Sequence, residues 1–154
     1  MRIEKFIQSC LLGFCLLVIK PVLVQAADTA CPPRHGSVSR AMFTTRIDNR
    51  EPVDQVLILD DNVKLIYFFS ELRNFQGHEI IHRWEHDGKV VSQKSFNVKG
   101  SRWRVFSSLR LDDSMLGRWT VIVTTKDGCP IKASVFQYVA AGAKGQGSAI
   151  LKIK

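Results

Sequence analysis

The chain has 154 residues, with 22 basic and 14 acidic side chains and a formal net charge of +8 at pH 7. This length supports one compact domain and excludes two domains with separate cores. The positive balance favours anionic partners, namely phosphorylated lipids, acidic glycans or nucleic acid.

Residues 1–26 have the layout of a signal peptide, with two basic residues, an apolar run and small residues near Ala26. A lysine and a proline interrupt the run, which argues against a permanent membrane helix of about 20 apolar residues. The alternative, a lipoprotein signal at Cys10 or Cys15, fits less well, because phenylalanine precedes Cys15 and the run before Cys10 is short. Export predicts a periplasmic or secreted bacterial protein with a net charge of about +6. It makes nucleic acid the poorest of the anionic partners.

Two cysteines follow the predicted signal, Cys31 and Cys129. An oxidising compartment would let them pair as a disulfide with a structural role. The chain-entropy estimate for so long a loop is roughly 4–5 kcal/mol of stabilisation. Two unpaired thiols are the alternative, because the sequence does not fix the distance between the α-carbons.

Residues 38–139 alternate short apolar and polar runs with turn signals, and no window sustains a helical period. A lead-in segment at 27–37 precedes this domain, and a Gly-rich basic tail at 140–154, expected to be flexible, follows it. The strands expected in chain order are 37–47, 62–70, 79–86, 89–98, 102–109, 118–125 and 130–139.

Seven or eight strands without helices predict an all-β fold, an antiparallel two-sheet sandwich of the immunoglobulin-like type. A closed small barrel is the alternative. Residues 62–70 are apolar on both faces, which is typical of a central strand. Asp87-Gly88 predicts a tight hairpin between the two strands that flank it.

The three tryptophans are expected to point inward. Because successive side chains of a strand point to opposite faces, Trp84, Trp103 and Trp119 each share a face with aliphatic residues. The opposite faces carry Arg83, Glu85, Arg102, Arg104 and Arg118.

A ligand site on these strands would use arginines and a tryptophan together. Guanidinium groups suit anionic ligands, and an aromatic face suits a sugar ring. The candidate ligand-binding residues are therefore Arg83, Arg102, Arg104 and Arg118, with Trp84 or Trp103 as stacking partners. The alternative is that Glu85, Asp112 and Asp113 neutralise the arginines in solvated salt bridges of little energy.

Metal binding and catalysis have weak support. His78, His82 and His86 recur every four residues, but four residues of a strand span roughly 13 Å, too far for a shared ion. An ion at a domain edge stays open as an alternative, because His78 lies at a turn. No nucleophile elbow, phosphate loop or Cys-Xaa-Xaa-Cys pair occurs in the sequence. We therefore expect no cofactor, no metal and no enzyme activity.

Four motifs, "EPVD", "HRW", "RWR" and "GRWTV", occur in this order within residues 38–138. In this combination the chain resembles the bacterial DUF 2914 family, a domain of unknown function. The resemblance implies a single domain of the cell envelope and supplies no activity and no catalytic residue.

The motif residues Glu51, His82, Arg83, Arg102 and Arg104 are more polar than a scaffold requires. In one explanation, Glu51 and the arginines form an ion-pair network that fixes how the sheets meet, and His82 and Trp119 are structural. In the other, the arginines recognise an anion.

We expect a non-enzymatic binding or scaffolding module whose partner is an anionic envelope glycan, peptidoglycan or lipid head group. The alternative partner is an envelope protein bound through an exposed edge strand. A hydrolase or metal-handling protein assembled from separate loops is the third interpretation.

Overall fold

The computed structural model describes residues 31–32, 36–142 and 149–152. They all belong to one compact unit, Cys31–Lys154. The predicted signal peptide, residues 1–26, lies outside the described residues, as do parts of the predicted lead-in segment and tail.

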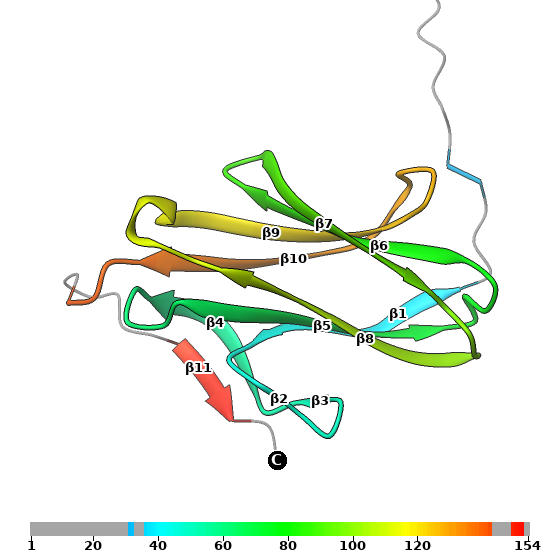
Figure 1. Ribbon diagram of the computed structural model, residues 1–154, viewed down its shortest axis with the longest axis horizontal. Helices are drawn as coiled ribbons and strands as arrows, with labels where there is room; N and C mark the ends of the chain where they lie inside the picture. Colours follow the sequence, from blue (N-terminus) through cyan, green and yellow to red (C-terminus); the bar gives the residue numbers. More distant parts are fainter. Residues whose placement is uncertain (1–30, 33–35, 143–148, 153–154) are drawn as a thin grey trace, which may run out of the picture. The chain divides into compact units, whose positions relative to one another are not determined.

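The described residues form strands and one short 3-10 helix, without an α-helix (Figure 1). The elements are β1 Ser37–Thr44, β2 Ile47–Asp48, β3 Glu51–Pro52, β4 Asp54–Asp60, β5 Leu65–Arg73, β6 Glu79–His86, β7 Lys89–Asn97, β8 Arg102–Arg110, η1 Asp113–Met115, β9 Gly117–Thr125, β10 Pro130–Val139 and β11 Ala149–Lys152. The all-β prediction is confirmed.

The eight long strands are hydrogen-bonded into one sheet in the order β7-β6-β9-β10-β4-β1-β5-β8. The pairs are antiparallel except for β10 with β4, which is parallel. The sheet curls until it is nearly closed into a barrel, as the right-handed twist of strands allows. Within the described residues, β7 and β8 are its two end strands.

The core lies inside this curled sheet, and both halves of the sheet contribute to it. Phe43 of β1 packs on Phe68 of β5 at 5.0 Å between ring centroids, and on Trp84 of β6 at 5.8 Å. Phe136 of β10 lies 4.6 Å from Phe43. All four rings are almost completely buried, so strands from both halves of the sheet share one core.

The prediction of two separate antiparallel sheets differs from this topology. Residues 54–60, which the sequence pattern had assigned to no strand, form β4. Because β4 pairs with both β1 and β10, it connects what would otherwise be two sheets. The arrangement is closer to the barrel alternative, and the immunoglobulin-like sandwich is not confirmed.

Two local predictions agree with the structure. Asp87 and Gly88 both have positive φ, 47° and 80°, as a two-residue hairpin turn between β6 and β7 requires. Strand β5 lies between β1 and β8, and its neighbouring residues Phe68 and Phe69, which point to opposite faces, are both fully buried, which explains why this run is apolar on both faces.

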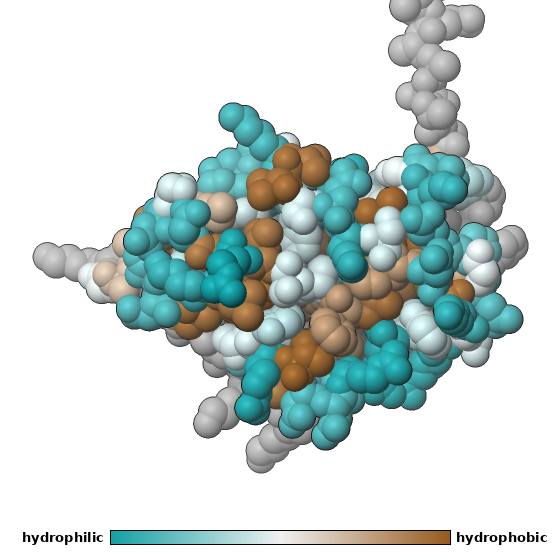
Figure 2. All heavy atoms as spheres, in the orientation of Figure 1, coloured by the Kyte–Doolittle hydropathy of each residue, from teal (hydrophilic) through white to brown (hydrophobic). Residues whose placement is uncertain are grey.

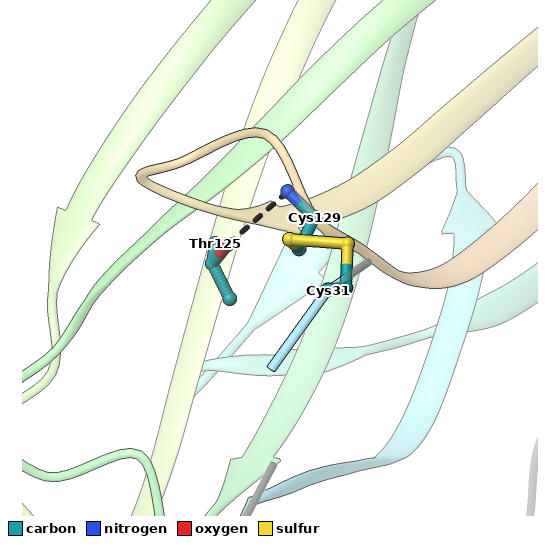
Figure 3. The surroundings of a disulfide bond; sticks show 3 residues. All are labelled: Cys31, Thr125 and Cys129. Atoms are coloured by element: carbon teal, nitrogen blue, oxygen red, sulfur yellow. Dashed lines mark hydrogen bonds between the residues drawn. A yellow bond between two sulfur atoms is a disulfide. The ribbon is translucent and has the colours of Figure 1, made fainter. Parts of the chain in front are cut away.

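Cys31 and Cys129 form a disulfide, as predicted (Figure 3). Their α-carbons are 5.6 Å apart, and the bond spans 98 residues of sequence. The Cys129 backbone N–H also donates to the Thr125 hydroxyl at 3.2 Å. The disulfide therefore fixes the segment before β1 to the hairpin between β9 and β10.

Within the predicted tail, β11 pairs antiparallel with β4. No helix in the described part of the chain is long and apolar enough to cross a membrane.

Candidate functional site

The outer face of β1, β5 and β8 places charged residues side by side. In the antiparallel register, Arg40 and Arg104 lie on either side of Glu71, and Arg102 lies opposite Arg73. Paired residues of neighbouring strands point to the same face of a sheet, so these side chains form one surface.

Glu71 is the buried centre of this surface, with only 1% of the residue exposed. Its carboxylate accepts hydrogen bonds from Arg102 at 2.8 Å, from Arg73 at 2.6 Å and from the Ser39 hydroxyl at 3.0 Å. The Arg102 bond, followed by those of Ser39 and Arg73, lowers the pKa of Glu71 to about 2 against the opposing effect of burial. Glu71 is therefore an ionised carboxylate at neutral pH.

Glu51 is the second carboxylate of this surface and begins β3. It accepts from Arg40 at 2.8 Å through one oxygen and from Arg104 through the other. Because Arg40 and Arg104 belong to β1 and β8, Glu51 ties the short β2–β3 hairpin to both long strands. The Arg40 guanidinium also lies 5.0 Å from the ring of Phe69.

Arg50, in the turn of the β2–β3 hairpin, reaches the edge of β8. Its guanidinium lies 5.7 Å from the ring of Trp103 and donates to the Arg104 carbonyl at 3.3 Å. Asn49 and Arg50 both have positive φ, 47° and 64°, so the backbone of this turn is held in a sparsely populated conformation. Arg50, Arg102, Trp103 and Arg104 line an open pocket of about 190 Å³.

We call Arg40, Arg50, Arg73, Arg102 and Arg104 the arginine cluster. The ion pairs of the described residues join four of these arginines to two carboxylates, so three positive charges remain in excess. The Arg102 side chain is 51% exposed although it binds Glu71. Figure 2 shows the side on which β8 passes in front of the other strands, and hydrophilic residues there surround separate hydrophobic ones.

The structure brings together only some of the predicted ligand-binding residues. Arg102, Trp103 and Arg104 line one pocket, although strand parity had placed Trp103 on the face opposite the two arginines. Arg83 lies on β6, in the other half of the sheet, and donates to Glu85 at 2.8 Å. Arg118 is exposed at the start of β9. The four arginines that were predicted to form one surface therefore lie in two different parts of the sheet.

The acidic residues expected to neutralise the arginines are also placed differently. Asp113 pairs with Lys64, and Asp112 caps the 3-10 helix by accepting from the Ser114 backbone N–H at 2.9 Å. Among the predicted neutralising residues, Glu85 alone has a predicted arginine as its partner in the ion pairs of the described chain.

Trp84 is 1% exposed and belongs to a buried polar network, so it offers no face to a ligand. His82 lies between two serines, with Nε2 2.8 Å from the Ser70 hydroxyl and Nδ1 2.9 Å from the Ser107 hydroxyl. The Trp84 indole N–H donates to Ser107 at 3.0 Å. We call these four residues the His82 network. The predicted structural role of His82 accords with this placement.

Burial lowers the pKa of His82 to about 3. The imidazole is therefore neutral at pH 7, with one ring nitrogen donating and the other accepting. A serine next to a histidine suggests a nucleophile and its base. Here the Ser107 oxygen is already engaged by two partners, and the histidine is a weak base, so the arrangement favours a structural role.

The remaining aromatic and histidine residues singled out in the sequence lie in separate parts of the structure. Trp119 is fully buried, donates to the Met115 carbonyl at 2.9 Å and stacks on His86 at 4.6 Å. His78 lies exposed in the turn before β6. The described residues contain no group of three or more His, Cys, Asp or Glu side chains placed to hold a metal ion.

Sequence patterns missed Arg40, Arg50, Arg73 and Glu71 as members of the site. One signal was present: Glu71 lies between Ser70 and Leu72 at the end of a largely apolar strand, where a buried charge requires partners. Its partners could not be named without the register of β1, β5 and β8.

Residues 77–138 match the model of a family described as "Protein of unknown function (DUF2914)". The match runs from β6 to β10, includes the motifs "HRW", "RWR" and "GRWTV", and supports membership of the family that the motifs indicated. No curated protein matches the chain.

Proposed function

We propose that this member of the DUF2914 family is a non-enzymatic binding module for an anionic component of the cell envelope, and that the arginine cluster holds the anion. The observation that carries the proposal is the charge excess near Trp103: four arginines share two carboxylates, and Arg50 adds a fifth guanidinium group beside an open pocket. Glu51 and Glu71 hold the arginines in place, and the excess charge remains for a ligand.

The polar motif residues had two explanations, an ion-pair network and an anion-recognition site. On this proposal both apply to the arginine cluster. A network of fixed guanidinium groups loses less side-chain entropy on binding than free arginines would. The exported, periplasmic or secreted location belongs to the same proposal, and the disulfide between Cys31 and Cys129 supports it, since such bonds persist in oxidising compartments.

The immunoglobulin-like arrangement is also kept as a proposal. What supports it is face-to-face packing across the core, where Phe43 and Phe68 of one half of the sheet contact Trp84 of the other half.

Edge-strand pairing with an envelope protein is less favoured. The end strand β7 carries Lys89 and Lys94, and the end strand β8 carries Arg102, Arg104 and Arg110. Charged side chains of this kind oppose the pairing of an edge strand with another chain.

The test is co-sedimentation of the full chain with insoluble peptidoglycan, and with lipopolysaccharide vesicles, at low and moderate salt. An Arg102→Ala, Arg104→Ala variant removes two charges from the cluster, and an Arg83→Ala, Arg118→Ala variant removes two charges elsewhere. We expect saturable binding that the first variant loses and the second retains. Equal loss in both variants would indicate attraction by net charge alone, and no binding to either material would reject the proposal.

A further inference from the structure

The two end strands of the sheet lie on either side of a second pocket, which we call the edge groove. It has a volume of about 290 Å³, near the lower end of the roughly 300–1,000 Å³ typical of ligand pockets. It is lined by Ser92, Gln93 and Lys94 of β7 and by Phe106 and Ser108 of β8. The two buried lining residues, Ser107 of β8 and Trp84 of β6, form its floor.

The lining of the edge groove combines neutral hydrogen-bonding groups with one lysine, Lys94, and one exposed aromatic ring. Hydroxyl and amide side chains both donate and accept, as the hydroxyl groups of a sugar require. Phe106 is 41% exposed, so a ring face or edge is accessible for apolar contact. A single exposed aromatic residue is ordinary on a protein surface, but this one borders a polar groove.

Strand β8 connects the edge groove to the arginine cluster. Arg102, Arg104, Phe106 and Ser108 alternate with inward-facing residues and so point to one face of the strand. At the rise of a strand, Phe106 lies roughly 7 Å from Arg104, and Ser108 roughly 13 Å. A ligand that touches both ends is therefore longer than one sugar ring or one phosphate.

We infer that the chain binds an acidic oligosaccharide along β8, with an anionic group at the arginine cluster and a further sugar ring in the edge groove. This inference rests on the proposed function and names its ligand class. It selects a glycan over a lipid head group or a free phosphate, because those ligands would occupy only the arginine end.

The floor of the groove supports binding rather than chemistry. The hydroxyl of Ser107 is held by His82 and by the indole of Trp84, at 2.9 and 3.0 Å. The floor is therefore rigid, and the exposed groups of Gln93, Lys94 and Phe106 remain for the ligand.

The test is calorimetric titration of the full chain with galacturonic acid, with tetragalacturonate and with inorganic phosphate. Phe106→Ala and Gln93→Ala change the edge groove. Val135→Ala removes an exposed hydrophobic side chain from β10, outside both pockets, and is the matched control. Arg102→Ala, Arg104→Ala reports on the arginine end.

We expect tetragalacturonate to bind at least about tenfold more tightly than galacturonic acid. Phe106→Ala should weaken tetragalacturonate binding about fivefold, and Gln93→Ala less, while both leave phosphate binding unchanged. Val135→Ala should change neither. Unchanged phosphate binding also shows that the groove variants are folded.

If Phe106→Ala and Gln93→Ala bind tetragalacturonate as the unmodified chain does, while the arginine variant loses every anion, the edge groove is no subsite and the arginine cluster stands alone. If none of the three anions binds, the proposed function itself is rejected. The two failures are therefore distinguishable.

Discussion

The His82 network and the arginine cluster are both built from polar side chains on neighbouring strands, yet they end in opposite electrostatic states. In the His82 network, four neutral side chains bond to one another inside the core, and no charge is present at pH 7. In the arginine cluster, five positive charges meet two negative ones on a half-exposed face.

The difference shows how polarity can serve packing in one place and recognition in another. A buried polar group is tolerated when every donor and acceptor has a partner, and the described residues contain no buried side-chain nitrogen or oxygen without one. A surface that recognises an anion needs an excess of positive charge that the protein's own carboxylates do not neutralise. Changes to the first region should therefore act on stability, and changes to the second on binding.

The largest expected effect is in the His82 network. His82→Ala should lower the free energy of unfolding by about 3 kcal/mol, because it opens a cavity and leaves the hydroxyls of Ser70 and Ser107 short of a partner. Urea denaturation measures this loss. His78→Ala, at an exposed turn, is the control and should change stability by less than about 0.5 kcal/mol. Equal effects of the two substitutions would contradict the buried network.

The pH dependence of stability should separate the two regions. The pKa of His82 falls from 6.5 to about 3 on folding. The contribution of the neutral His82 to folding stability is therefore complete above pH 6.5. It is lost as the pH falls from 6.5 towards 3, because the unfolded chain then binds a proton that the folded chain does not. The loss is at most about 1.4 kcal/mol per pH unit. Unfolding measured from pH 7 to pH 4.5 should show this decline in the unmodified chain. His82→Gln should flatten the curve over this range, and an unchanged curve would reject the assignment.

Glu71→Gln should move stability and binding in opposite directions. Loss of the ionised carboxylate should lower the free energy of unfolding by about 2 kcal/mol. The unmodified chain should lose stability as the pH falls from 4.5 to about 2, and the variant should lack this decline. Arg73 and Arg102 then lack their counter-charge, so anion affinity should rise. Denaturation and phosphate titration measure the two effects. Glu85→Gln, whose partner Arg83 lies outside the cluster, is the control and should leave affinity unchanged.

Glu51→Gln should have the smallest effect on stability. The Glu51 side chain is 38% exposed, so its ion pairs with Arg40 and Arg104 contribute less than about 1 kcal/mol. It too should raise phosphate affinity, by about two- to threefold. A fall in affinity would mean that Glu51 orders the cluster more than it neutralises it.

Local patterns in the sequence predicted the parts of the molecule that depend on neighbouring residues. Period-two alternation placed Trp84 and Trp119 inside, and Asp87-Gly88 located a hairpin whose φ angles match. The pairing of Cys31 with Cys129 followed from the compartment that the predicted signal implies. The first two inferences need only neighbouring residues, and the third needs only the two cysteines that follow the predicted signal.

The parts that depend on pairing between distant strands were not predictable. Strand β4 has only a short apolar run, which the sequence pattern did not distinguish from a loop. Its parallel pairing with β10 is a contact between residues far apart in the sequence. Glu71 meets Arg102 only because β5 pairs with β8, 31 residues later. For the same reason, Arg83 and Arg102 looked equivalent in sequence but lie in different halves of the sheet.

The most direct test of the central claim is a residue-resolved NMR titration. The arginine Nε–Hε and tryptophan indole resonances of the full chain would be followed as galacturonic acid is added at low salt. We expect saturable shifts for Arg50, Arg102, Arg104 and Trp103, and none for Arg83, Arg118 and Trp84. Shifts spread evenly over all the arginines, or confined to Arg83 and Arg118, would contradict it.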